Sequence, residues 1–128
     1  MALITHPVNE VTGLVIGAAV AVHRGLGPGL LESAYQACLE HEFTVRGIEH
    51  DVQVAVPVVY KTTRLDCGYR LDFVVSSCVI VEVKSVDCLL PIHEAQVLTY
   101  LKLTSLPAAL LLNFNVRSMR RGIRRLPA

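Results

Sequence analysis

The sequence lacks the features that mark membrane proteins, secreted proteins and compact zinc sites. Its longest uncharged apolar stretch, from Val11 to Val22, contains two glycines and is shorter than the roughly 20 residues of a membrane-spanning helix. No basic region followed by a cleavage site precedes it, which argues against a signal peptide. None of the four cysteines forms a C-x-x-C pair, and none of the five histidines forms an H-x-x-x-H pair. We therefore expect a cytoplasmic protein outside the membrane, with reduced and mostly buried thiols in place of a zinc site.

Neither sign of charge predominates in the chain as a whole, since 12 lysines and arginines oppose 11 aspartates and glutamates. Five arginines nevertheless fall within nine residues near the C-terminus. On a helix, four of them would form one continuous basic stripe suited to nucleic-acid phosphates, although Gly122 weakens the helix prediction. We expect these four to bind substrate: Arg117, Arg120, Arg121 and Arg124. The alternative is a solvated tail, or pairing with acids elsewhere in the chain.

The length of 128 residues fits a single domain over residues 1–128. Hydrophobic residues make up 52% of the chain without counting glycine, which is high against an ordinary range of about 45–50% that includes glycine. This excess predicts an exposed apolar surface that binds a partner, and a second copy of the chain is the simplest partner. We therefore expect a homodimer.

The spacing of apolar residues predicts helices packed on a sheet. Helices are expected over residues 9–24, 31–46 and 91–102. Strands are expected over residues 52–60, 69–75, 79–84 and 108–114. Asn9 is the expected N-cap of the first helix, Gly47 is expected just after the second, and Pro57 indicates an edge strand or a bulge. The order α-α-β-β-β-α-β predicts an α/β fold.

Two of these strands, "YRLDFVV" and "VIVEVK", carry charged residues where apolar ones are expected. If the intervening "SSC", residues 76–78, forms a three-residue hairpin loop, Asp72 falls directly opposite Glu82. Lys84 lies two residues after Glu82, so its side chain leaves the strand on the same side. The same register gathers the apolar residues on the opposite face, namely Leu71, Phe73, Val81 and Val83.

Two carboxylates directly opposite each other repel, so something positive is expected between them. Mg²⁺ or Mn²⁺ would offset the repulsion, because one or two carboxylates together with waters and phosphate oxygens form a common Mg²⁺ site. The alternative is an exposed ion triad in which Lys84 partly neutralises Asp72 and Glu82. The spacing alone leaves both interpretations open.

Several segments resemble the GxxExxY family, a small bacterial branch of the PD-(D/E)XK nuclease superfamily. Asp72 followed by Glu82-Val83-Lys84 is similar to the D…(D/E)-x-K signature, and "GLLESAY", residues 29–35, fits G-x-x-E-x-x-Y. The segments "VHRGLGPGLLESAY", "GYRLDFVV", "VIVEVKSVD" and "HEAQVLTYLKLT" extend the resemblance over nearly the whole chain. It implies a restriction-endonuclease-like α-β-β-β-α-β core, with a mixed sheet flanked by helices.

The resemblance also implies roles for individual residues. Asp72 and Glu82 would be metal ligands together with the carbonyl of Val83. Glu32 would be a further acid of the kind that superfamily members often add to the site, as a catalytic residue and metal ligand. Lys84 would position or activate the attacking water and stabilise charge on the phosphate.

A second part of the resemblance lies on the following helix, where Gln96 and Tyr100 match a Q-x-x-x-Y element. Gln96 would act in catalysis and Tyr100 in substrate binding, although a structural hydrogen bond explains the pair equally well. Glu32 also has a simple explanation, since a carboxylate in the first turn of a helix is favoured by the helix dipole. The residue before Asp72 is Leu71, so the proline of the signature is absent.

Together these residues predict a nuclease that uses Mg²⁺ or Mn²⁺ to hydrolyse nucleic-acid phosphodiesters. The metal would lower the pKa of a bound water and neutralise the phosphate. The alternative is a non-catalytic homodimeric module that binds nucleic acid or protein and retains the nuclease fold. We expect no separate recognition domain in a chain of this size, so specificity would have to come from loops, from dimerisation or from a protein partner. Neither DNA nor RNA is favoured as the substrate.

Overall fold

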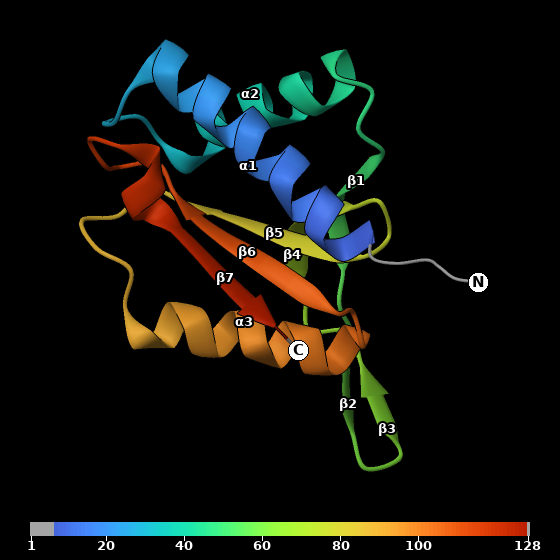
Figure 1. The fold of residues 1–128 in the computed structure, drawn as a ribbon. Coiled ribbons are helices and arrows are strands. Elements are labelled where there is room, and N and C mark those ends of the chain that lie inside the picture. The colour runs from blue at the N-terminus through green and yellow to red at the C-terminus, as the bar shows by residue number, and fades with distance from the viewer. Residues whose placement is uncertain (1–6, 128) are drawn as a thin grey trace.

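A computed structural model describes residues 7–127, in which a central sheet lies between helices and a small hairpin projects from it (Figure 1). In chain order the elements are α1 (Pro7–Leu26), α2 (Glu32–Val45), β1 (His50–Ala55), β2 (Val58–Tyr60), β3 (Thr63–Leu65), β4 (Arg70–Val75), β5 (Val79–Lys84), α3 (Pro91–Thr104), β6 (Ala108–Asn113), the short 3-10 helix η1 (Met119–Gly122) and β7 (Ile123–Pro127). Helices α1 and α2 cover one face of the sheet, and α3 covers the other (Figure 1).

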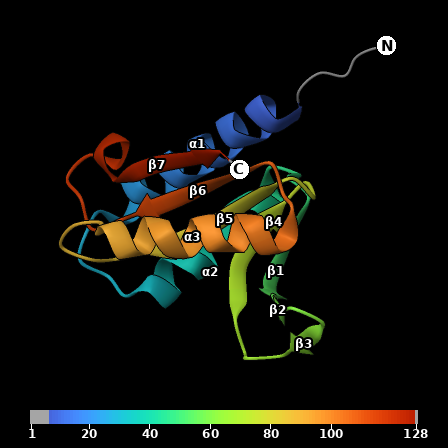
Figure 2. The same cartoon turned by 90° about the horizontal axis from the view of Figure 1, so that it is seen from below.

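The central sheet has the strand order β1-β4-β5-β6-β7. Strands β5 and β6 are parallel, and every other neighbouring pair is antiparallel. A parallel pair needs a crossover connection, which α3 provides as it returns the chain across the sheet (Figure 2). This mixed sheet flanked by helices confirms the predicted α/β class and is consistent with the restriction-endonuclease-like fold.

Apolar side chains fill both faces of the sheet. On the side of α1 and α2, Tyr35 stacks on Phe114 with ring centroids 4.7 Å apart, and Phe43 meets Phe73 edge to face at 5.3 Å. A second apolar cluster lies between the sheet and α3. Strands β5 and β6 are buried on both faces, which explains their nearly continuous apolar sequences. Glu82, within β5, is therefore an acid in the centre of the molecule.

The hairpin that carries the acids has the predicted register. Val75 pairs with Val79, so residues 76–78 form a three-residue loop. Ser76 and Ser77 adopt positive φ angles of 50° and 57°, which allows the chain to reverse direction within this short loop. Strand β5 has the predicted bounds.

The helices lie within two residues of their predicted bounds, but the predicted N-cap is wrong. Asn9 lies inside α1, where its Oδ1 accepts a hydrogen bond of 2.6 Å from Arg125 Nη2. Gly47 follows α2 with a φ of 69°, as expected for the residue that ends a helix.

The predicted strand over residues 52–60 is in fact two strands. β1 ends before Pro57, and β2 pairs with β3 in a separate two-stranded hairpin. Proline has no N–H to donate to a ladder, which explains why the central sheet ends there. The prediction of an edge strand is correct for β1, whereas β3 was not predicted.

The basic helix expected near the C-terminus is also wrong. Residues 119–122 form only η1, and residues 123–127 form β7, which pairs antiparallel with β6. Gly122 lies where η1 passes into β7, and a Cβ at this position would overlap the backbone carbonyl of Asn113, so the close approach of the chain to β6 requires glycine. Without a helix the arginines do not form one continuous stripe.

Among the helices of residues 7–127, none is long and apolar enough to cross a membrane. All four cysteines are free thiols. Cys38 and Cys78 are half-buried while Cys67 and Cys88 are exposed, so the expectation of mostly buried thiols is wrong.

Candidate active site

Strands β4 and β5 separate where their two acids face each other. The last backbone-paired residues are Phe73 and Val81. One residue further, the Asp72 N–H donates to Glu82 Oε2 at 2.8 Å, and the Val83 N–H donates to Asp72 Oδ2 at 2.8 Å. Each carboxylate thus binds the backbone of the opposite strand, which fixes its orientation. Each has a second oxygen that accepts no backbone hydrogen bond, and the two carboxyl side chains also hydrogen-bond to each other.

Asp72 also lies where β4 changes the face toward which its side chains point. Phe73 packs in the cluster against α1 and α2, whereas Leu71 packs in the cluster against α3. Regular alternation would put both on one face, so the prediction that Leu71 shares a face with Phe73 is wrong. The register places Gln53 of β1 opposite Asp72, and its φ of 50° interrupts the regular pleat at this point.

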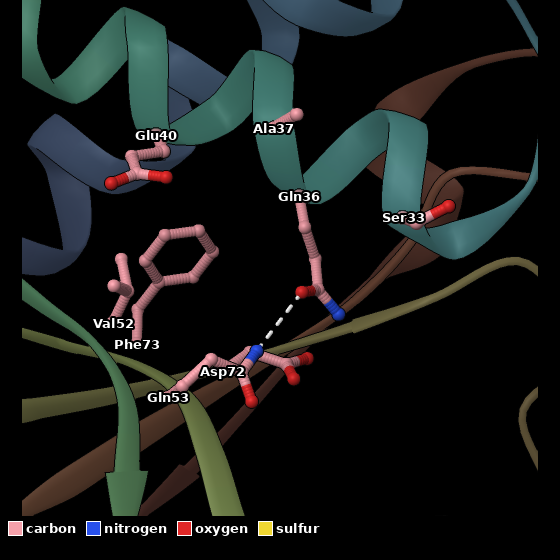
Figure 3. A pocket seen from close by; sticks show the side chains of 8 residues that line it. All are labelled: Ser33, Gln36, Ala37, Glu40, Val52, Gln53, Asp72 and Phe73. Atoms are coloured by element: carbon pink, nitrogen blue, oxygen red, sulfur yellow. Dashed lines mark hydrogen bonds between the residues drawn. The ribbon is translucent and has the colours of Figure 1, made fainter.

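A hollow of ≈ 220 Å³ between α2 and the sheet is lined by Asp72 (Figure 3). Gln36 points from α2 toward the sheet, and Gln53 Nε2 donates to Gln36 Oε1 at 3.2 Å. This bond ties α2 to the interrupted position of β1. Sequence reasoning missed both glutamines; the available signal was that Gln36 lies one helical turn after Glu32, on the same face of α2.

Burial and mutual repulsion disfavour two negative charges in this position. Glu82 is 6% exposed, and burial together with the charge of Asp72 raises its pKa from 4.5 to about 8. Burial also raises the pKa of Asp72, although the hydrogen bond from the Val83 N–H opposes this effect. The positive charge of Lys84 lowers both pKa values. In the absence of a further cation, the acid pair therefore favours holding a proton.

The acid pair has the donor chemistry of a site for a hard divalent cation. Asp72 and Glu82 each keep one oxygen that accepts no backbone hydrogen bond, and a cation there would replace the proton that the pair holds. Within residues 7–127 no group of three His, Cys, Asp or Glu side chains could hold a metal ion. Two carboxylates are nevertheless enough for Mg²⁺, which commonly keeps several waters. The residues present therefore fit such an ion.

Lys84 ends β5 and is half-buried. Within residues 7–127, the only basic and acidic side chains closer than 4.0 Å are those of Arg46 and Glu42. The Lys84 ammonium therefore lies more than 4.0 Å from the carboxylates of Asp72 and Glu82. Its charge acts on them without direct contact. The ammonium remains available to a third group.

Glu32, the first residue of α2, is directed at the end of β5. The Ser85 N–H donates to Glu32 Oε2 at 3.4 Å, and Ser85 Oγ donates to the Leu30 carbonyl at 2.6 Å. The residue that follows Lys84 is therefore anchored to the start of α2. The charge of Glu32 also raises the pKa of Asp72.

Tyr35 holds the loop from which α2 begins. Its hydroxyl donates to the Gly27 carbonyl and accepts the Leu30 N–H at 3.2 Å, while its ring stacks on Phe114. Leu30 is therefore held by Tyr35 from one side and by Ser85 from the other. The spacing G-x-x-E-x-x-Y thus has a structural consequence, because it fixes the loop that meets the end of β5.

Asn113, which sequence reasoning did not single out, holds the same segment from β6. It is 2% exposed and is the register partner of Lys84. Its Oδ1 accepts the Val86 N–H at 3.0 Å, and its Nδ2 donates to the Val86 carbonyl at 2.9 Å. The available signal was a polar residue within the apolar run "AALLLNF". The two residues after Lys84 are thus held by α2 on one side and by β6 on the other.

Comparison with protein-family models agrees with this arrangement. Residues 9–126 match the model of the PD-(D/E)XK nuclease superfamily. The chain belongs to this superfamily. Neither the search of curated proteins nor the search of solved structures gave a match. Membership supports a nuclease-type function, and PD-(D/E)XK nucleases typically use divalent metals and act on nucleic acid.

In this PD-(D/E)XK chain, Gln96 and Tyr100 lie side by side at a hollow near the acids. The hollow, of ≈ 340 Å³, is also lined by Tyr69, whose ring centroid is 6.2 Å from that of Tyr100. Burial raises the pKa of Tyr100, and the negative charge of Glu82 raises it further, which indicates that its hydroxyl lies within electrostatic reach of the pair. Gln96 is exposed at the rim of the hollow.

The four arginines of the expected stripe lie on different surfaces. Arg117 and Arg120 line a hollow beside the end of α1. Arg121 is exposed in η1. Arg124 is exposed on β7, which β6 separates from β5. A role for each of them in substrate binding stays a prediction.

Proposed function

We propose that the protein is a divalent-metal-dependent nuclease of the GxxExxY branch that hydrolyses nucleic-acid phosphodiesters with Mg²⁺ or Mn²⁺. The observation that carries this proposal is the pair of carboxylates, Asp72 and Glu82, placed together where β4 and β5 separate, with Lys84 at the end of the same strand. A bound cation supplies a water of lowered pKa and neutralises the phosphate.

The residues of the chain contribute position and charge. Asp72 and Glu82, with the carbonyl of Val83, hold the cation, and the backbone N–H groups that they accept keep the carboxylates from turning away. Lys84 orients the attacking water and stabilises negative charge on the phosphate. Glu32 keeps the end of β5 in place and adds a negative charge near Asp72.

On the α3 side, Gln96 and Tyr100 supply polar contacts to the reacting phosphate and its nucleotide. Both line one hollow on the α3 side, where burial and then the negative charge of Glu82 raise the pKa of Tyr100. Gln96 is exposed and can therefore reach a bound strand directly.

A cleavage assay tests the proposal. Purified protein is incubated with single- and double-stranded DNA and RNA in the presence of Mg²⁺, Mn²⁺ or a chelator. Asp72→Asn, Glu82→Gln and Lys84→Ala should each abolish metal-dependent cleavage, and the triple variant should be scarcely worse than any single one, because residues that act as a unit are not additive. Lys102→Ala, an exposed lysine of α3, is the control. Full activity of Lys84→Ala would refute the mechanism.

A second candidate is a binding module that works as a homodimer or with a protein partner that supplies specificity. It is favoured by exposed apolar side chains at the starts of α2 and α3, where Leu31 is 78% and Ile92 is 67% exposed. Light scattering over a concentration series tests this candidate. We expect a dimer that Leu31→Ser with Ile92→Ser converts to a monomer, and a monomer at every concentration would refute the homodimer.

A further inference from the structure

The arginines near the C-terminus are divided by the fold into groups with different surroundings. Arg125 is occupied, since its Nη2 donates to Asn9 Oδ1 at 2.6 Å and its Nη1 to Thr12 Oγ1 at 3.4 Å. Arg117 and Arg120 instead line a hollow beside the last turns of α1, and Arg24 of α1 lines the same hollow. These three arginines define what is here named the arginine pocket.

The arginine pocket has a volume of ≈ 400 Å³ and lies between the last turns of α1 and the segment that leads into η1. Its other lining residues are apolar or neutral polar, apart from His23, and none is acidic. The three arginines are exposed. Within residues 7–127 none of them has a carboxylate within 4.0 Å. Three guanidinium groups thus border one hollow without an anionic partner from the described part of the chain.

The walls of the pocket are held by contacts between distant parts of the sequence. His23 Nε2 lies 2.6 Å from the Val116 carbonyl, and the His23 side chain is buried. Met119 of η1 is buried in the same cluster as Val22 of α1. The end of α1 and the segment carrying Arg117 therefore form one packed unit, which fixes the backbone positions from which the arginines extend.

The charge of the pocket exceeds what the helix end explains. A basic side chain near the C-terminus of a helix is favoured by the helix dipole, and this accounts for Arg24. Arg117 and Arg120 lie outside that helix, so their approach adds repulsion between like charges. An anion in the pocket would remove the repulsion, and phosphate is the anion that the planar guanidinium binds best, through paired hydrogen bonds.

The pocket is close to the acid pair along the sheet. Lys84 and Asn113 are register partners, and Arg117 follows four residues later, so its Cα lies at most about 14 Å from that of Asn113. Both views place η1 and the loop after β5 at the same end of the sheet (Figures 1 and 2). Glu82 lies two residues before Lys84, and β6 is the strand next to β5, which adds about 7 Å and about 5 Å, so the Cα atoms of Glu82 and Arg117 lie at most about 26 Å apart. At a rise of about 3.4 Å per nucleotide, a strand lying across the acid pair would reach the pocket within about eight nucleotides.

We propose that the arginine pocket binds one backbone phosphate of the nucleic-acid substrate, other than the phosphate that is cleaved. This inference rests on the proposed nuclease function. The convergence of Arg24, Arg117 and Arg120 on one phosphate distinguishes it from three independent surface contacts. The contact fixes the direction of the bound strand without reading its sequence.

The salt dependence of binding separates these possibilities. The parent is the full chain carrying Glu82→Gln, and fluorescence anisotropy measures its affinity for a short duplex over a KCl series. When the protein loses its contact with one phosphate of duplex DNA, the slope of log affinity against log salt decreases in magnitude by about 0.9. Arg24→Gln, Arg117→Gln and Arg120→Gln in one chain should therefore decrease this magnitude by about 0.9 if they share a single phosphate, and by about three times as much if they bind three. A decrease near 0.9 supports the proposal, and an unchanged slope or the threefold decrease overturns it.

A control variant removes three positive charges elsewhere: Lys61→Gln, Arg64→Gln and Lys102→Gln. If it flattens the plot as much as the pocket variant does, general charge explains the effect and the proposal is wrong. Inorganic phosphate, added to the parent without DNA, distinguishes the source of the ligand. Phosphate binding as tight as that of the duplex would overturn the assignment to a polynucleotide. A parent that binds no nucleic acid at all would refute the proposed nuclease function, whereas loss of the pocket effect alone leaves that function standing.

Discussion

The acid pair makes the stability of the metal-free protein depend on pH, and the substitution Glu82→Gln should remove most of that dependence. In the folded protein, burial and the charge of Asp72 raise the pKa of Glu82 from 4.5 to about 8. Between these values the folded chain holds a proton that the unfolded chain has released, so the free energy of unfolding falls as the pH rises. The slope is about 1.4 kcal/mol per pH unit, which gives a loss on the order of 4 kcal/mol between about pH 5 and pH 8.

The variant preserves the shape of the side chain but cannot ionise. The glutamine amide can still accept the Asp72 N–H and can donate to the Asp72 carboxylate. We therefore expect similar stability near pH 5, and a variant more stable than the wild type by several kcal/mol near pH 8. Urea unfolding in a chelating buffer at a series of pH values measures both proteins. Glu49→Gln is the control, because Glu49 is an exposed acid outside the pair. Parallel curves for the wild type and Glu82→Gln would show that Glu82 ionises normally in the folded state.

Three further predictions concern the metal and the segments that hold the site. Calorimetry should show that the affinity for Mn²⁺ rises about tenfold per pH unit until about pH 8, because the cation displaces the proton of Glu82; a flat profile would place the ion elsewhere. Asn113→Ala should lower the free energy of unfolding by about 1–3 kcal/mol, because Val86 loses both of its hydrogen bonds to Asn113, and should lower kcat more than it raises KM; an unchanged kcat would separate Asn113 from Lys84. Tyr35→Phe keeps the stacked ring but loses the hydroxyl, and should destabilise the protein by about 1–2 kcal/mol in urea unfolding; unchanged stability would show that the loop at Gly27 is held by other contacts.

The elements that could be predicted from sequence are those whose pattern is local. The register of β4 and β5 followed from a three-residue loop and from the faces of the two strands, and β5 was placed to the residue. The helix prediction for the C-terminal segment was wrong, although its arginines have helical spacing. In the folded chain, the carbonyl of Asn113 leaves room only for glycine at position 122. That close approach exists only in the folded chain, and the local signal for it was Gly122 itself, which weakens a helix prediction.

The prediction that Leu71 and Phe73 share a face of the sheet was wrong for a related reason. Alternation along β4 is a sound expectation for a regular strand, but the strand opposite has a residue with positive φ at Gln53. Glutamine gives no warning of such a backbone conformation, since glycine and asparagine are the residues that usually adopt it. The interruption lies opposite Asp72, at the point where β4 leaves β5.

Three irregular residues of this fold lie in or beside the strands that carry the acid pair. Gln53 has a positive φ, Glu82 is a buried acid, and Asn113 is a buried amide within an apolar strand. Each is unfavourable in isolation. A positive φ strains a residue other than glycine, a buried polar group costs free energy unless it is hydrogen-bonded, and a buried charge costs more. Natural chains retain such departures mainly at functional sites. The amide of Asn113 is satisfied by the segment after Lys84, whereas a proton neutralises Glu82. The acid pair is thus the position among these residues where a ligand can still lower the free energy, which is the physical reason to expect a cation there.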